Sequence, residues 1–261
     1  MLPHHQQTID RVTAHFKDNP DFLALIIGGS LAKNWHTPDS DVDIMLIATD
    51  AEYARRLPTN ELTYFTTEFC DYEGGYVDGK ILDMAFLHDV AARGSEPARS
   101  AFVGAWIAVS RIEGLEDLLA QITTYPETTH IHKLQSFYAQ LEAAHWFVGE
   151  GEKRGNRYLS MRYATEMVLY TTRLMLAHNR MLYPFHKWML KALEQAPDKP
   201  DDLLHRIETL LADPNKANAK ALFDCVTGFT DWPKPPEGWG ARFLQDVETT
   251  WRTGDVYIAD W

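Results

Sequence analysis

The sequence has few cysteines and no long apolar run. Its 261 residues include only two cysteines, Cys70 and Cys225, which are too few and too far apart for a disulfide framework. The longest nearly apolar runs, 23–27 and 101–109, fall well short of the roughly 20 residues that span a bilayer. The N-terminus lacks the basic start and apolar stretch of a signal peptide. These absences predict a cytoplasmic protein with no membrane partner.

Basic residues are also scarce, since 25 Lys and Arg face 37 Asp and Glu, for a formal net charge of −12. Coating nucleic acid requires a cationic surface, so nucleic acid is not an expected partner. The stretch from Glu150 to Lys191 is the exception, with eight basic and three acidic residues, which makes +5 there and leaves −17 elsewhere. Such an island would suit a bound triphosphate. Solvated helix faces balanced by acidic neighbours are the alternative.

The periodicity of apolar residues changes near residue 115. Before it, an apolar run at 23–27 and an alternating stretch at 42–46 predict strands. Further strands are expected at 61–70, 76–87 and 103–111, with Gly74-Gly75 and Asp78-Gly79 as turns, and helices at 8–18, 51–57 and 88–93. After it, three- and four-residue spacings predict helices at 128–149, 157–180, 186–196, 201–212, 215–228 and 240–252. The expected fold is α+β, with a small mixed-sheet domain at 1–114 and an all-helical bundle domain at 115–261.

Two carboxylates stand at alternate positions of the second predicted strand. Alternation places Asp41 and Asp43 on the same side of the strand. Two carboxylates about 4 Å apart would repel by roughly 4 kcal/mol at an effective dielectric constant near 20. A divalent cation removes that cost, and a ligand set made only of oxygen suits Mg²⁺. Asp83, a polar residue in the apolar stretch 81–86, is expected to be a third carboxylate at this site.

The residues Gly28-Gly29-Ser30, separated from Asp41 by ten residues, offer a place for an anion. Glycines let the backbone approach a ligand closely, and a helix start after them directs N–H groups at an anion. Ser30 adds a hydroxyl donor. Three carboxylates and a phosphate-binding turn predict in-line nucleotidyl transfer with two metal ions.

This arrangement resembles the DNA polymerase β-like nucleotidyltransferase superfamily, and within it the stand-alone bacterial aminoglycoside and lincosamide nucleotidyltransferases. The resemblance implies that Gly29 and Ser30 hold the β- and γ-phosphates and that Asp41 and Asp43 bind Mg²⁺. By the same resemblance Asp83 binds metal or deprotonates the acceptor hydroxyl.

The chain departs from the family pattern at Lys33-Asn34, where many members have Arg-Gly. Lys33 keeps the positive charge for a phosphate but not the planar fork of Arg. We expect Asn34 to take the left-handed backbone conformation that Gly would provide.

In the predicted helix 157–180, spacings of four, three and four place Arg162, Glu166, Leu169 and Arg173 on one face. The resemblance implies that Glu166 is an alternative general base, and that Arg162, Arg173 and Lys187 contact the triphosphate. An ion pair within the helix is the competing interpretation.

The expected function is Mg²⁺-dependent transfer of a nucleoside monophosphate, AMP from ATP, to a hydroxyl of a small molecule, with release of pyrophosphate. A cationic antibiotic would suit the net charge. Arg173 and His178 also match the Arg-x4-His spacing of RNA-cutting helical domains of the HEPN type, which keeps an RNase open as an alternative. A catalytically idle nucleotide-binding or antitoxin-like protein is the third hypothesis, and both a monomer and a homodimer remain open.

Overall fold

The computed structural model describes residues 1–254 and 258, and divides into two compact units, Met1–Thr124 and Tyr125–Trp261. The division lies later in the chain than the predicted boundary after residue 114. Helix α6 (Leu115–Thr123) accounts for the difference, because its buried face packs into the core of unit 1. Positions 255–257 and 259–261 of the predicted helical domain lie outside the described residues.

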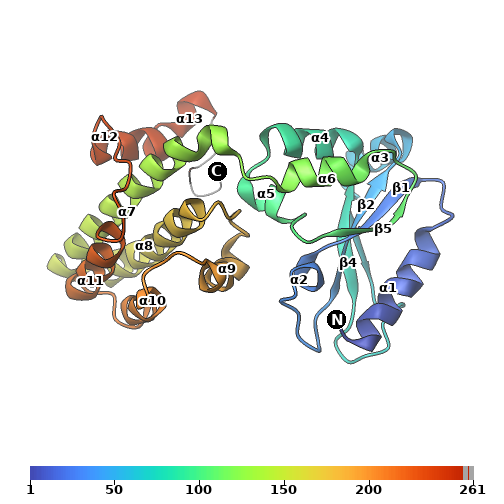
Figure 1. The fold of residues 1–261 in the computed structure, drawn as a ribbon, viewed down its shortest axis with the longest axis horizontal. Helices are drawn as coiled ribbons and strands as arrows, with labels where there is room; N and C mark the ends of the chain where they lie inside the picture. Colours follow the sequence, from blue (N-terminus) through green and yellow to red (C-terminus); the bar gives the residue numbers. More distant parts are fainter. Residues whose placement is uncertain (255–257, 259–261) are drawn as a thin grey trace. The chain divides into compact units, whose positions relative to one another are not determined.

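Unit 1 is built on a five-stranded mixed sheet in the order β3-β4-β2-β1-β5 (Figure 1). The strands are β1 (Phe22–Ile27), β2 (Val42–Ala48), β3 (Thr63–Thr66), β4 (Val77–Leu82) and β5 (Trp106–Ser110). Strands β2 and β4 run parallel, and the other three pairs are antiparallel. Apolar side chains of both faces make β1 and β2 the buried centre of the sheet.

Helices cover the two faces of the sheet (Figure 1). On one face, α1 (Pro3–Phe16) buries Ile9, Val12 and Phe16, which its three- and four-residue spacing places on one side. On the other face, α4 (Met84–Arg93) and α6 bury Leu87 and Leu115 among others. The central strands β1 and β2 therefore contribute alternate residues to two separate cores.

Three shorter helices complete unit 1: α2 (Gly29–Ala32), α3 (Asp50–Arg56) and α5 (Glu96–Ser100). The predicted strand 76–87 is too long, because β4 ends at Leu82 and Asp83 caps α4. The Asp78-Gly79 turn is wrong as well, because both residues lie inside β4.

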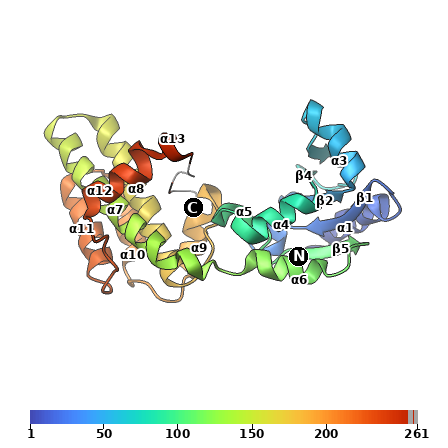
Figure 2. The same cartoon turned by 90° about the horizontal axis from the view of Figure 1, so that it is seen from above.

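Unit 2 is helical. Its two long helices, α7 (His130–Lys153) and α8 (Arg157–His178), lie side by side in both views (Figures 1 and 2). Helices α9 (Met189–Gln195), α10 (Leu203–Ala212) and α11 (Lys216–Thr227) follow the predicted ranges. The predicted helix 240–252 is instead α12 (Trp239–Phe243), a π-helical turn at Leu244–Glu248 and α13 (Thr250–Thr253).

The expected α+β class, a mixed sheet followed by helices, is confirmed. Within the described part of the chain, no helix combines the length and apolar character needed to cross a bilayer.

Candidate active site

Three carboxylates meet at one end of the two parallel strands. Asp43 lies in β2 and Asp78 in β4, and the register pairs them directly across the sheet. Asp41, just before β2, points to the same side, so that one oxygen of each carboxylate lies within 4.8 Å of the others. All three residues are half-buried. Three carboxylate oxygens at this separation fit a hard cation such as Mg²⁺, which takes oxygen ligands.

The structure does not bring Asp83 to this cluster, and the prediction that it lies there is wrong. Leu82 pairs with Ile47, so Asp83 lies past the opposite end of β4, roughly 16 Å along the strand from Asp78 at about 3.3 Å per residue. Its carboxylate accepts a hydrogen bond of 2.8 Å from the Phe86 N–H as the N-cap of α4. Capping explains why a carboxylate follows an apolar strand here.

Asp78 was missed because an Asp-Gly pair is a common turn signal. The alternation of Asp78 and Lys80 with the apolar Val77 and Ile81 is a signal of a strand. Local pattern alone cannot show that Asp78 stands opposite Asp43, because that depends on the parallel register of β2 and β4.

The Gly28-Gly29-Ser30 turn packs directly against Asp43. The Gly28 N–H donates to the Asp43 carbonyl at 3.0 Å. Gly29 has a φ of +64°, and a Cβ atom there would lie 1.6 Å from Asp43 Oδ2, so only glycine allows this approach. The Ser30 side chain is buried, with 6% exposure, and its hydroxyl has no hydrogen-bond partner among the residues that the structure describes.

Lys33 and Asn34 follow this turn. Burial lowers the pKa of Lys33 below its ordinary value, and the negative charge of Asp43 partly offsets that effect. Lys33 therefore lies within electrostatic range of Asp43. Asn34 has a φ of 56°, which confirms the left-handed conformation expected for it.

Aromatic residues hold the segment before Asp41. The Tyr72 hydroxyl donates to the Ser40 carbonyl at 2.7 Å, and the His4 ring lies 2.9 Å from the Pro38 carbonyl. The Tyr76 hydroxyl faces Asp41, and its hydrogen bond to that carboxylate is the main reason that its pKa rises to about 12. Contacts from α1 and from the β3–β4 loop thus fix where Asp41 points.

The predicted site residues of α8 belong to unit 2 and form contacts there. Arg162 donates to Glu166 in an ion pair within the helix. The guanidinium of Arg173 is sandwiched between two aromatic rings, 4.5 Å from the Phe137 centroid and 4.3 Å from that of Tyr183. With 1% exposure, Arg173 is a core residue.

Most of the predicted basic island is paired with acidic side chains, as the alternative interpretation expected. Lys187 is exposed and lies over the Trp188 ring at 5.3 Å. The ion pairs are Lys153 and Arg154 with Glu150, Arg162 with Glu166, Arg180 with Glu127, and Lys191 with Glu194.

Arg173 and His178 do not form a joint site. Five residues of α-helix separate their directions by about 140°. His178 lies 2.6 Å from Asp198 and contacts the rings of Phe229 and Trp232. The RNase alternative therefore loses the geometry on which it depended.

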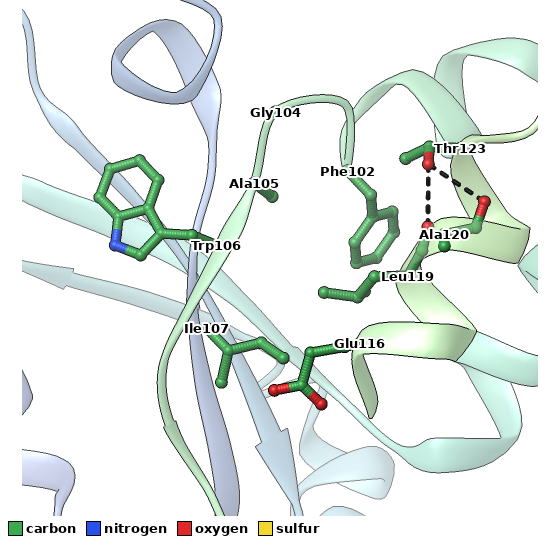
Figure 3. A pocket seen from close by; sticks show the side chains of 9 residues that line it. All are labelled: Phe102, Gly104, Ala105, Trp106, Ile107, Glu116, Leu119, Ala120 and Thr123. Atoms are coloured by element: carbon green, nitrogen blue, oxygen red, sulfur yellow. Dashed lines mark hydrogen bonds between the residues drawn. The ribbon is translucent and has the colours of Figure 1, made fainter. Parts of the chain in front are cut away.

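A separate cavity of about 400 Å³ lies in unit 1 between the 102–105 loop, β5 and α6. Figure 3 shows Phe102 and Leu119 pointing toward each other in it, while Trp106 turns to the opposite side of its strand. The Thr123 hydroxyl is used by carbonyls of its own helix. Glu116 is the one charged side chain among the residues lining this cavity, so polar groups do not converge there.

Comparison with known proteins gives matches to one family model and to solved structures. The model of a family described as a domain of unknown function (DUF4037) matches residues 101–189, a segment that lies outside the carboxylate cluster. No protein of curated function matches the chain. Among solved structures, a nucleotidyltransferase-like protein from Exiguobacterium sibiricum 255-15 is similar with a TM-score of 0.49 and 16% identity, over 95% of this chain and 79% of that chain.

Proposed function

We propose that this protein is a Mg²⁺-dependent nucleotidyltransferase that transfers a nucleoside monophosphate, AMP from ATP in the first instance, to a hydroxyl of a small molecule. The observation that carries the proposal is the close contact of Gly29 with Asp43, whose carboxylate clusters with those of Asp41 and Asp78. The next residue, Ser30, has a buried hydroxyl without a hydrogen-bond partner among the described residues. A metal triphosphate requires both.

In the proposed reaction the Ser30 hydroxyl donates to an oxygen of the β- or γ-phosphate, and Lys33 adds positive charge nearby. Asp41, Asp43 and Asp78 would hold one or two metal ions, depending on how many the bound substrate carries. Bound Mg²⁺ would supply charge neutralisation at the α-phosphate and at the departing pyrophosphate.

The bond changes are those of an in-line displacement. The acceptor oxygen forms a bond to the α-phosphorus, and the bond from that phosphorus to the bridging oxygen breaks with its electron pair leaving on pyrophosphate. A carboxylate takes the acceptor proton. Asp78 is the candidate in place of Asp83.

Arg173 is left out of the proposed site, because its guanidinium is enclosed by Phe137 and Tyr183. A cationic hydroxylated compound remains the preferred acceptor because of the net charge of −12.

Calorimetric titration of the four nucleoside triphosphates, with and without Mg²⁺, tests the proposal. Wild type should bind at least one of them only with Mg²⁺, and the double variant Asp41→Asn with Asp43→Asn should not. Because the double variant relieves repulsion between carboxylates, its unfolding midpoint should match or exceed that of wild type. Equal binding by both proteins, or no binding of any triphosphate by wild type, would overturn the proposal.

A further inference from the structure

Phe65 lies in the same row of the sheet as the carboxylates. In the antiparallel pair β3–β4 it stands opposite Asp78, which in turn stands opposite Asp43 across β2. Directly paired residues point to the same face of a sheet. The row therefore runs Phe65, Asp78, Asp43, and ends at the Gly28–Gly29 turn beside β1.

The Phe65 side chain is 67% exposed, which is unusual for a large apolar residue in a strand. The Tyr76 ring lies beside it, with the centroids 5.4 Å apart and the planes tilted by 34°. The Tyr76 hydroxyl faces Asp41. Two ring faces thus border the carboxylates on the side of β3.

The two ends of the row differ in chemistry. At the β1 end, the buried hydroxyl of Ser30 suits phosphate oxygens. At the β3 end, the rings of Phe65 and Tyr76 offer apolar faces, which suit an uncharged ring. The exposed Lys80 lies two residues after Asp78 on the same face of β4. In an in-line displacement the attacking oxygen and the leaving oxygen stand on opposite sides of the phosphorus. With the departing pyrophosphate at the Ser30 end, the attacking hydroxyl approaches from the Phe65 end.

We infer that Phe65 and Tyr76 form the acceptor subsite, and that the acceptor is a hydroxyl-bearing ring with a flat apolar face that stacks on Phe65. This inference rests on the proposed function, because the direction of attack defines which end receives the acceptor. Phe65 is a specificity-determining residue in this arrangement. The Phe65 ring positions the acceptor by stacking on its flat face. The hydroxyl of the acceptor then points toward the neighbouring carboxylates.

The test uses phenyl β-glucoside as the probe, because it carries a hydroxylated ring and an aromatic ring in one molecule. Saturation-transfer NMR measures its affinity for the full chain, with and without Mg²⁺ and ATP. Phe65→Ala should weaken probe binding by about 10-fold, the usual scale for loss of one aromatic stacking partner. Phe65→Trp should retain it, because tryptophan also offers a ring face.

Phe86→Ala is the matched control, since Phe86 is an exposed phenylalanine of the same unit on α4. It should bind the probe and the triphosphate as wild type does. No binding of the probe to wild type, or equal probe affinity of wild type and Phe65→Ala, would overturn the inference.

Triphosphate titration of the same variants separates this inference from the proposed function. If Phe65→Ala loses affinity for the triphosphate instead of the probe, Phe65 stacks on the nucleobase and the acceptor subsite is wrong. If wild type binds no triphosphate, the proposed function fails by its own test, and the assignment of the ring site to an acceptor fails with it. If wild type binds the triphosphate but not the probe, only the acceptor subsite is overturned.

Discussion

Gly29 and Asp43 are in such close contact that the Asp43 carboxylate occupies the space in which a Cβ atom of residue 29 would lie. The missing Cβ would lie 1.6 Å from Oδ2 and 2.6 Å from the Cβ of Asp43, at a φ of +64°. Gly29→Ala must therefore displace Asp43. We expect it to abolish Mg²⁺-dependent triphosphate binding in calorimetry, and to lower the free energy of unfolding by more than the roughly 1–2 kcal/mol of left-handed strain alone.

Gly74→Ala is the control for that variant. Gly74 also has a positive φ, +74°, but a Cβ there meets nothing within 4 Å. It should show the backbone strain in denaturant unfolding and bind triphosphate normally. Equal binding by the two alanine variants would show that the turn does not position Asp43.

The identity of the third carboxylate is tested by Asp78→Asn and Asp83→Asn. Loss of a metal ligand removes several kcal/mol of charge stabilisation, so Asp78→Asn should lower the rate of pyrophosphate release from ATP by about 100-fold or more. Asp83→Asn should leave that rate unchanged, because Asn caps helices as well as Asp does. A large loss with Asp83→Asn alone would restore the residue that sequence analysis favoured.

The hydroxyl of Ser30 is buried without a hydrogen-bond partner in the described structure, so its removal costs the folded protein little. Ser30→Ala should change the free energy of unfolding by less than about 0.5 kcal/mol. It should weaken triphosphate binding by about 10-fold or more, because hydrogen bonds to charged groups contribute roughly 1.5–3 kcal/mol.

Ser95→Ala provides the opposite case. The Ser95 hydroxyl accepts from the Ala98 N–H as the N-cap of α5, so its loss should cost about 1 kcal/mol of stability without changing triphosphate affinity. A stability loss of that size in Ser30→Ala, with unchanged affinity, would assign Ser30 a structural role.

Acid stability should depend on Glu52. Hydrogen bonds from Arg55, and then from Arg56, outweigh burial and lower the pKa of Glu52 from 4.5 to about 2. Because the folded-state pKa is the lower one, the stabilisation is present above pH 4.5 and is lost as the pH falls toward 2. The difference in thermal midpoint between wild type and Glu52→Gln should therefore be largest near pH 6 and shrink by pH 3.5. A difference independent of pH would contradict this role.

Local pattern was sufficient for much of unit 1. The apolar run before Gly28 and the alternation around Asp41 and Asp43 predicted β1 and β2, because short apolar or alternating stretches are typical of buried strands. The left-handed Asn34 followed from the preferences of one residue type. The long helices α7 and α8 followed from their periodicity, because apolar residues three and four apart share a helix face.

Chain register decided the rest. Asp78 reaches Asp43 because two strands far apart in sequence run parallel with one particular alignment, and a shift by one residue would turn Asp78 to the other face. Asp83 has more apolar neighbours in the sequence than Asp78, but it lies past the end of β4 and caps helix α4. Arg173 carries the same charge in any fold, but packing between Phe137 and Tyr183 makes it part of a core. The sequence by itself determined which residue types could bind a metal triphosphate, and the tertiary structure decided which of them meet, since long-range pairing leaves no local periodicity to detect.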